Sequence, residues 1–97
     1  MGSNMKALWN GTVIAESDKT LVVESNHYFP RDSIVLELFQ ESDKTSHCPW
    51  KGDAHYLSIL VDGELNLDAA WHYPSTLQAA KEIEGMVAFW HGVEVVE

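Results

Sequence analysis

The 97-residue chain contains a single cysteine, Cys48. One cysteine excludes an intramolecular disulfide and a thiolate-rich metal cage, and low cysteine use is typical of the cytoplasm. No apolar run approaches the roughly 20 residues that a membrane-spanning helix needs. The N-terminus also lacks the basic and then apolar pattern of a signal peptide. We therefore expect a cytoplasmic protein that is neither inserted in a membrane nor exported.

Positive charge is also scarce, because six Lys and Arg residues oppose fifteen Asp and Glu residues and leave a net charge of −9. Binding to nucleic acids or to anionic membranes depends on clustered Lys and Arg. We expect neither a nucleic-acid partner nor a membrane partner. The chain has no Walker A loop, no Gly-x-Gly-x-x-Gly and no Gly-x-Ser-x-Gly, so the common ATPase, dinucleotide-binding and hydrolase patterns are missing.

The length fits one small domain. Residues 1–4 precede a second methionine, Met5, and look like a vector remnant, so we assign the domain to residues 5–97. Ten aromatic residues, four of them Trp, are expected to supply much of the core.

Turn signals recur at short intervals, among them Glu24-Ser25-Asn26 and Ser42-Asp43-Lys44, and predict short strands between them. Asn10-Gly11 and Asp62-Gly63 are typical of tight antiparallel hairpins, because both residues tolerate a positive φ. We expect a mainly β protein, bordering on α+β, with about eight antiparallel strands rich in β-branched and aromatic residues. The expected strands are Ala7–Trp9, Thr12–Ala15, Thr20–Glu24, Ile34–Phe39, His55–Val61, Leu65–Leu67, Met86–Trp90 and Val93–Val96.

One segment has a helical pattern. Ser75 and Gln78 have the spacing of a capping box, and Gly85 can end a helix. Leu77, Ala80 and Ile83 then form an apolar stripe, which predicts a C-terminal helix from about Thr76 to Glu84 lying on the sheet. Pro30-Arg31-Asp32 instead favours a tight turn or a single 3₁₀ turn.

The stretch from His47 to Tyr56 holds the most varied functional groups. Lys51 offers a positive charge to an anion, Gly52 permits close approach, and Trp50 offers a ring. Cys48 and His55 are weak catalytic candidates, since a thiol needs a base within hydrogen-bond reach. The alternative is that Cys48 and Trp50 pack in the core and that the residues around Lys51 form an ordinary solvated turn.

Two further segments carry candidate ligand-binding residues. Arg31 can pair with Asp32 as a structural tie, or it can hold a ligand oxyanion beside Tyr28. Trp71 and Tyr73 lie two residues apart, so in an extended strand they share one face while the intervening His72 points to the other. The His and Cys residues are scattered, and we expect no metal site.

These segments together resemble the domain-of-unknown-function 427 family, over about residues 7–96. The most specific part is the Cys-Pro-x-Lys-Gly block followed by an aromatic strand. The residues that carry the resemblance are Asn10-Gly11, Ala15-Glu16-Ser17, Tyr28-Phe29-Pro30-Arg31-Asp32, Cys48-Pro49-Trp50-Lys51-Gly52-Asp53-Ala54-His55-Tyr56, Ala70-Trp71-His72-Tyr73-Pro74 and Val87-Ala88-Phe89.

The resemblance implies a small bacterial domain without an assigned activity or cofactor. It also implies a rolled antiparallel sheet, similar to β-tent domains, with one helix. Those domains often bind zinc through two Cys-x-x-Cys knuckles, which the single Cys48 does not provide. A nucleotidyltransferase label is sometimes attached to the family, yet the chain lacks a Gly-Ser pattern with paired carboxylates.

Our hypothesis is a cleft that binds a polar or anionic small molecule. The expected ligand-binding residues are Tyr28, Arg31, Asp32, Trp50, Lys51, Gly52, Trp71 and Tyr73. Two alternatives stay open: a module that binds a protein partner, with the motifs mainly structural, and a nucleotidyltransferase-like or Cys- or metal-dependent enzyme.

Overall fold

The structure, a computed structural model, describes residues 4–97. Residues 1–3 of the expected vector remnant lie outside the described part. The described residues form nine strands in three antiparallel sheets, together with three short 3₁₀ helices, so the expectation of a mainly β protein is confirmed.

The largest sheet has four strands in the order β5 (Phe39–Cys48), β6 (Gly52–Val61), β7 (Glu64–His72) and β8 (Val87–Phe89). A second sheet has the order β2 (Thr12–Ser17), β1 (Met5–Trp9) and β9 (Glu94–Val96). The strands β3 (Leu21–Val23) and β4 (Asn26–Tyr28) pair by themselves. The 3₁₀ helices are η1 (Arg31–Ser33), η2 (Leu36–Leu38) and η3 (Gln78–Ile83).

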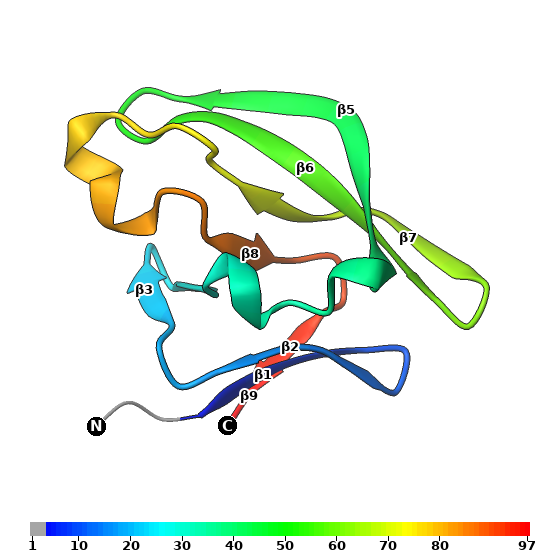
Figure 1. Cartoon of the computed structure of the whole chain (residues 1–97). Coiled ribbons are helices and arrows are strands. Elements are labelled where there is room, and N and C mark those ends of the chain that lie inside the picture. Colours follow the sequence, from blue (N-terminus) through cyan, green and yellow to red (C-terminus); the bar gives the residue numbers. More distant parts are fainter. Residues whose placement is uncertain (1–3) are drawn as a thin grey trace.

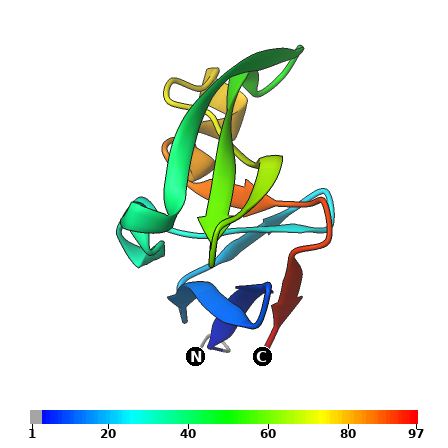
Figure 2. The same ribbon diagram turned by 90° about the vertical axis from the view of Figure 1, so that its right-hand side faces the viewer.

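The long strands β5, β6 and β7 lie at the top of Figure 1, and the sheet of β1, β2 and β9 lies below them. Figure 2 shows the same separation from the side, with the described ends of the chain together at the bottom. The 3₁₀ helix η3 lies at the end of the large sheet that is far from the β6–β7 turn (Figure 1).

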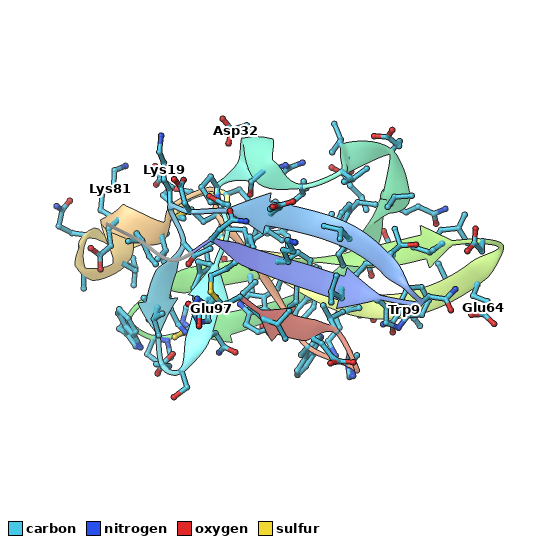
Figure 3. All side chains as sticks on the ribbon, turned by 90° about the horizontal axis from the view of Figure 1, so that it is seen from below. Trp9, Lys19, Asp32, Glu64, Lys81 and Glu97 are labelled. Atoms are coloured by element: carbon cyan, nitrogen blue, oxygen red, sulfur yellow. The ribbon has the colours of Figure 1, made fainter. Side chains whose placement is uncertain are left out.

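Both hairpins expected from their turn dipeptides are confirmed. Asn10 and Gly11 have φ values of 51° and 74° between β1 and β2, and Asp62 and Gly63 have values of 52° and 79° between β6 and β7. Two successive positive φ values give the turn whose twist matches that of the strands. The two tips meet, because the Asn10 side chain donates a hydrogen bond to the Val61 carbonyl at 3.2 Å. Trp9 and Glu64 mark this end in Figure 3.

The strand prediction is wrong between residues 34 and 48. Ile34 makes only an isolated bridge to Ala15, and Leu36–Leu38 form η2 instead of a strand. The predicted turn at Ser42-Asp43-Lys44 lies inside β5, where the pairing with β6 shifts register. The strand β4 was not predicted. In contrast, the expected 3₁₀ turn after Pro30 is confirmed as η1.

The segment predicted as a helix over Thr76–Glu84 contains the shorter 3₁₀ helix η3, which is interrupted at Ala80. No side chain caps its N-terminus, so the predicted capping box does not form. Ala80 and Ile83 are buried as expected, but Leu77 is exposed. The Leu77 N–H donates instead to the Lys51 carbonyl at 3.0 Å, which ties the chain to the sheet before a full helical turn is complete.

Two apolar clusters hold the sheets together. The larger one lies between the three-stranded and four-stranded sheets and includes Ile14, Phe29, Ile59 and Phe89. The second includes Tyr28, Tyr56, Tyr73 and Ile83, where η3 and β4 contact the large sheet. Most of the aromatic motif residues belong to this second cluster.

Candidate functional site

The register of β6 and β7 gives the large sheet two chemically different sides. His55 lies opposite His72, and the next pair along the strands is Tyr56 opposite Trp71. Directly opposed residues share a side, and successive residues alternate between sides. We call the side with His55 and His72 the histidine face and the side with Tyr56 and Trp71 the aromatic face.

Two adjoining hollows lie on the histidine face, and both contact His55 and Pro74. Their volumes are about 270 Å³ and about 320 Å³. We call them together the histidine groove. The first is lined by Glu41, Ser42, His55, Tyr56, His72 and Pro74. The second is lined by His47, Gly52, Asp53, His55, Pro74, Ser75, Thr76 and Leu77.

The imidazoles of the groove have different electrostatic surroundings. Burial lowers the pKa of His72 below 6.5, and the positive charges of Arg31 and His55 lower it further, while Glu41 acts in the opposite sense. His72 is therefore neutral near pH 7. His47 lies at the outer end, where its Nδ1 is 2.7 Å from Asp53 Oδ1, and both side chains are well exposed.

This pKa shift predicts how acid affects stability. Because the folded pKa of His72 lies below its ordinary value, His72 contributes stability that is present above about pH 6.5 and is lost as the pH falls through the folded pKa. We expect the variant His72→Gln to lose less stability than the wild type on acidification from about pH 8 to about pH 5. Urea unfolding at each pH measures this. The exposed His91→Gln is the control, and an equal loss in all three proteins would contradict the prediction.

The wall of the groove that contains Thr76 is fixed by polar contacts. Glu84 accepts hydrogen bonds from the Thr76 N–H at 3.1 Å and from Lys81 Nζ at 2.8 Å. The hydrogen bond from Lys81, followed by that from Thr76, lowers the pKa of the Glu84 carboxyl. Gly52 forms a bridge with Thr76, so the wall is tied to the start of β6.

The Cys-Pro-Trp-Lys-Gly block forms the turn between β5 and β6, where Cys48 pairs with Gly52. Lys51 is buried, and its Nζ makes an ion pair with Glu24 from the β3–β4 turn. The same Nζ lies 5.3 Å from the centroid of the Trp50 ring and 5.6 Å from that of Tyr73. Burial by itself lowers the pKa of Lys51, but the hydrogen bond to Glu24 and the nearby Tyr28 and Tyr73 outweigh it, so the pKa is raised.

Tyr28 and Tyr73 surround this lysine from two elements. Both side chains are buried, and the Tyr28 hydroxyl accepts a hydrogen bond from Trp71 Nε1 at 3.2 Å. Burial raises the pKa of the Tyr73 hydroxyl, and the Lys51 charge offsets part of that rise. The arrangement holds a cation within the protein and leaves no free ammonium for a ligand.

The structure therefore brings together five of the predicted ligand-binding residues, namely Tyr28, Trp50, Lys51, Trp71 and Tyr73. Gly52 follows directly and lines the histidine groove. Arg31 does not join Lys51, because it is exposed and its charge acts on His72 at the histidine face. Asp32 lines a different, shallow hollow with Lys19, and both point outward in Figure 3.

The two catalytic candidates lie on opposite sides of the β5–β6 pair. Cys48 packs half-buried in the second apolar cluster, on the aromatic face, whereas His55 is exposed in the groove. His47 also alternates away from Cys48 and pairs with Asp53. The strand geometry thus separates the thiol from both imidazoles.

Two important residues were missed at the sequence level. Glu24 was interpreted only as the last residue of a strand and the first of a turn, and its contact with Lys51 spans 27 residues of sequence, so no local pattern predicts it. Glu41 lies in a strand that was not predicted. The side of His72, by contrast, follows from the alternation with Trp71.

Within residues 4–97, no group of three or more His, Cys, Asp or Glu side chains is arranged to hold a metal ion. The same residues contain no helix with the length and apolar character required to cross a bilayer.

No curated protein sequence matches the chain significantly. The family model that does match has a short name with a nucleotidyltransferase label, and it is described as a domain of unknown function, DUF427. Since that model matches residues 1–97, the chain belongs to the DUF427 family.

Proposed function

We propose that the histidine groove binds a small polar anion of the class of sugar phosphates and hydroxy acids. The observation that carries the proposal is the meeting of the two hollows at His55, beside His72 and the charge of Arg31. Volumes of about 270 Å³ and about 320 Å³ lie near the lower end of ligand pockets, which suits a metabolite-sized ligand.

The lining supports a ligand with two kinds of group. An anionic end near His55 and His72 gains hydrogen bonds and favours the protonated imidazoles, and the charge of Arg31, which acts on His72, adds attraction. Hydroxyl groups at the other end can donate to Asp53 or contact Thr76. Because the protein carries a net charge of −9, an anion needs such a local cluster, and we expect weak binding with a Kd on the order of 0.1–1 mM.

The proposal predicts that ligand binding raises the pKa of His72. Backbone amide and imidazole NMR spectra of the labelled protein, recorded near pH 6 with pooled sugar phosphates, carboxylic acids, nucleotides or neutral sugars, measure this. We expect shifts at His47, Gly52–His55 and His72–Leu77 with anionic pools and none with neutral sugars. The variant His55→Gln should weaken binding at least about fivefold, as expected for loss of one charge-assisted hydrogen bond.

Lys51→Met is a matched control, because its ammonium lies at the Glu24 contact and outside the groove. Equal shifts with neutral sugars, or unchanged affinity in His55→Gln, would refute the proposal. Shifts limited to nucleotides would favour the nucleotidyltransferase-like alternative.

A protein partner is the second candidate function. Leu60, Leu65 and Leu67 lie together on one side of the β6–β7 hairpin and are 37%, 54% and 63% exposed. Exposed apolar patches of this kind occur at interaction surfaces. No shift with any pool, in a well-dispersed spectrum, would favour this candidate.

Two finer features are part of the proposal, and a third alternative is weakened. A rolled, β-tent-like course of the large sheet is supported by the register shifts in both β5–β6 and β6–β7, since bulges bend strands. The cytoplasm is supported by the low cysteine content. An enzyme acting through Cys48 is less well supported, because the thiol and His55 lie on opposite faces.

A further inference from the structure

Three aromatic rings gather on the aromatic face, on the side of the large sheet opposite to His55 and His72. Tyr56 from β6, Trp71 from β7 and Trp90 after β8 form what we call the aromatic cluster. The rings of Tyr56 and Trp90 have centroids 5.9 Å apart and a tilt of 33°. Those of Trp71 and Trp90 are 5.5 Å apart and nearly perpendicular, at 72°. Differently oriented rings can contact one ligand from more than one direction.

The polar atoms of all three rings are already paired within the protein. Trp90 Nε1 donates to the Asp68 carbonyl at 2.5 Å, and Trp71 Nε1 donates to the Tyr28 hydroxyl at 3.2 Å. The Tyr56 hydroxyl lies 3.0 Å from Ser46 Oγ. These bonds fix the ring orientations before any ligand arrives. A ligand can therefore contact only the faces of the rings, which carry the negative part of the aromatic quadrupole.

A cation already occupies that surface. Lys44 Nζ lies 5.2 Å from the centroid of Tyr56 and 6.0 Å from that of Trp90. Lys44 is exposed on the edge strand β5, and no salt bridge to it is found in residues 4–97. The rings, and not a carboxylate, therefore hold this ammonium. Because the side chain is exposed and tethered only through β5, a competing cation can displace it.

The surrounding charge favours cations. The chain has a net charge of −9, which attracts positive ligands at low ionic strength. In addition, Asp68 Oδ1 is buried without a hydrogen-bond partner among the described residues. Asp68 is the residue whose carbonyl accepts the hydrogen bond of the Trp90 indole, so this unpaired carboxyl oxygen belongs to a residue that contacts the aromatic cluster.

We infer that the aromatic cluster is a binding site for an alkylammonium group, with quaternary or methylated ammonium preferred. Such a group has a weaker hydration shell than the primary ammonium of Lys44, so it loses less on leaving water for the rings. Lys44 then acts as an internal competitor that occupies the site when no ligand is bound.

The test is an NMR titration of the four tryptophan indole N–H signals with choline and with 3,3-dimethyl-1-butanol, its neutral carbon isostere. We expect choline to shift the Trp71 and Trp90 signals and the isostere to leave them unchanged. Lys44→Gln should bind choline roughly two- to fivefold more tightly, the range of an exposed cation–π contact. Equal shifts with the isostere, or unchanged affinity in Lys44→Gln, would overturn the inference.

Two tryptophans give a matched pair of variants, because Trp90 is 39% exposed and Trp50 is 38% exposed. Trp90→Leu should abolish the choline shift at Trp71, and Trp50→Leu should preserve it. Dispersed amide spectra establish that each variant is folded, and the Lys44→Gln result does not depend on either. Binding lost equally in both variants would contradict the assignment of the site.

The same ammonium chemistry can come from a free amine or from a methylated lysine side chain in a peptide. A trimethyllysine peptide and its unmethylated form, added in a separate arm, distinguish the sources. Tighter binding of the trimethyllysine peptide than of choline assigns the site to a protein ligand, and the reverse order assigns it to a free amine. No binding of either compound refutes the inference.

Discussion

The substitution Gly52→Ala is expected to lower the free energy of unfolding by about 3 kcal/mol. Gly52 has a φ of 119°, a region that residues with a Cβ rarely adopt. A Cβ at this position would also lie 3.0 Å from the Ser75 carbonyl oxygen, which belongs to backbone and cannot rotate away. The backbone strain of alanine at this φ and the steric overlap of its Cβ with the Ser75 carbonyl oxygen both contribute to the loss of stability. For a domain of this size the loss corresponds to a fall in Tm of roughly 12–24 °C.

Gly63→Ala is the matched control. Its φ is 79°, and nothing lies within 4 Å of the added Cβ, so only the backbone cost of about 1 kcal/mol is expected. Thermal unfolding followed by circular dichroism measures both variants. Equal losses in the two proteins would show that the turn before β6 adjusts without strain. Because Gly52 also lines the histidine groove, the folded fraction of Gly52→Ala should bind anions more weakly than the wild type.

Local turn chemistry explains which strands could be predicted. The pairs Asn10-Gly11 and Asp62-Gly63 specify their hairpins by backbone preference alone, and both form. The strand β5 could not be predicted in this way, because all of its side chains are at least partly exposed at the edge of the sheet. Edge strands commonly carry charges that discourage pairing with another chain, and such charges make them resemble loops. Ser42-Asp43-Lys44 was misinterpreted as a turn for this reason.

The helical prediction failed through competition from the tertiary structure. Ser75 and Gln78 have the spacing of a capping box. However, Thr76 forms a β-bridge with Gly52, and the Leu77 N–H donates to the Lys51 carbonyl, so this backbone is not available to start a helix. Glu84 then caps the Thr76 N–H from a distance of eight residues. The segment Gln78–Ile83 between these contacts forms 3₁₀ turns and no longer helix.

The sequence predicts which residues contribute to candidate sites, but it does not predict which of them lie together in the fold. The alternation along β7 correctly separates His72 from Trp71 and Tyr73. It cannot show that Arg31 lies with His72 or that Lys51 is buried, because both facts depend on contacts between distant segments. The two charges expected to form one anion site therefore act on different groups, Arg31 on His72 and Lys51 on Glu24, and the groove depends on histidines.

The ion pair between Lys51 and Glu24 gives the last large effect. We expect Glu24→Ala to lower the free energy of unfolding by about 2 kcal/mol, because it leaves the Lys51 ammonium buried without its carboxylate. The Lys51 side chain is 8% exposed and that of Glu24 is 56% exposed, so water replaces part of the lost contact and the cost stays below that of a fully buried pair.

Lys51→Met should cost less, about 1 kcal/mol, because methionine fills the space between Trp50 and Tyr73 and leaves only the exposed Glu24 unpaired. The double variant should then resemble Lys51→Met, and urea unfolding of all three proteins at pH 7 measures the coupling. Lys81→Met, which breaks the more exposed pair of Lys81 with Glu84, is the control and should leave the urea midpoint almost unchanged.

The pH dependence of the same variants separates the ion pair from simple packing. Because the folded pKa of Lys51 is raised above 10.5, its contribution is complete below that pH and is lost as the pH rises toward the folded value. The wild type should therefore lose more stability above about pH 10.5 than Glu24→Ala does. If Glu24→Ala costs no more than Lys51→Met at pH 7, and if the wild type and Glu24→Ala lose the same stability at alkaline pH, the buried ammonium does not depend on Glu24.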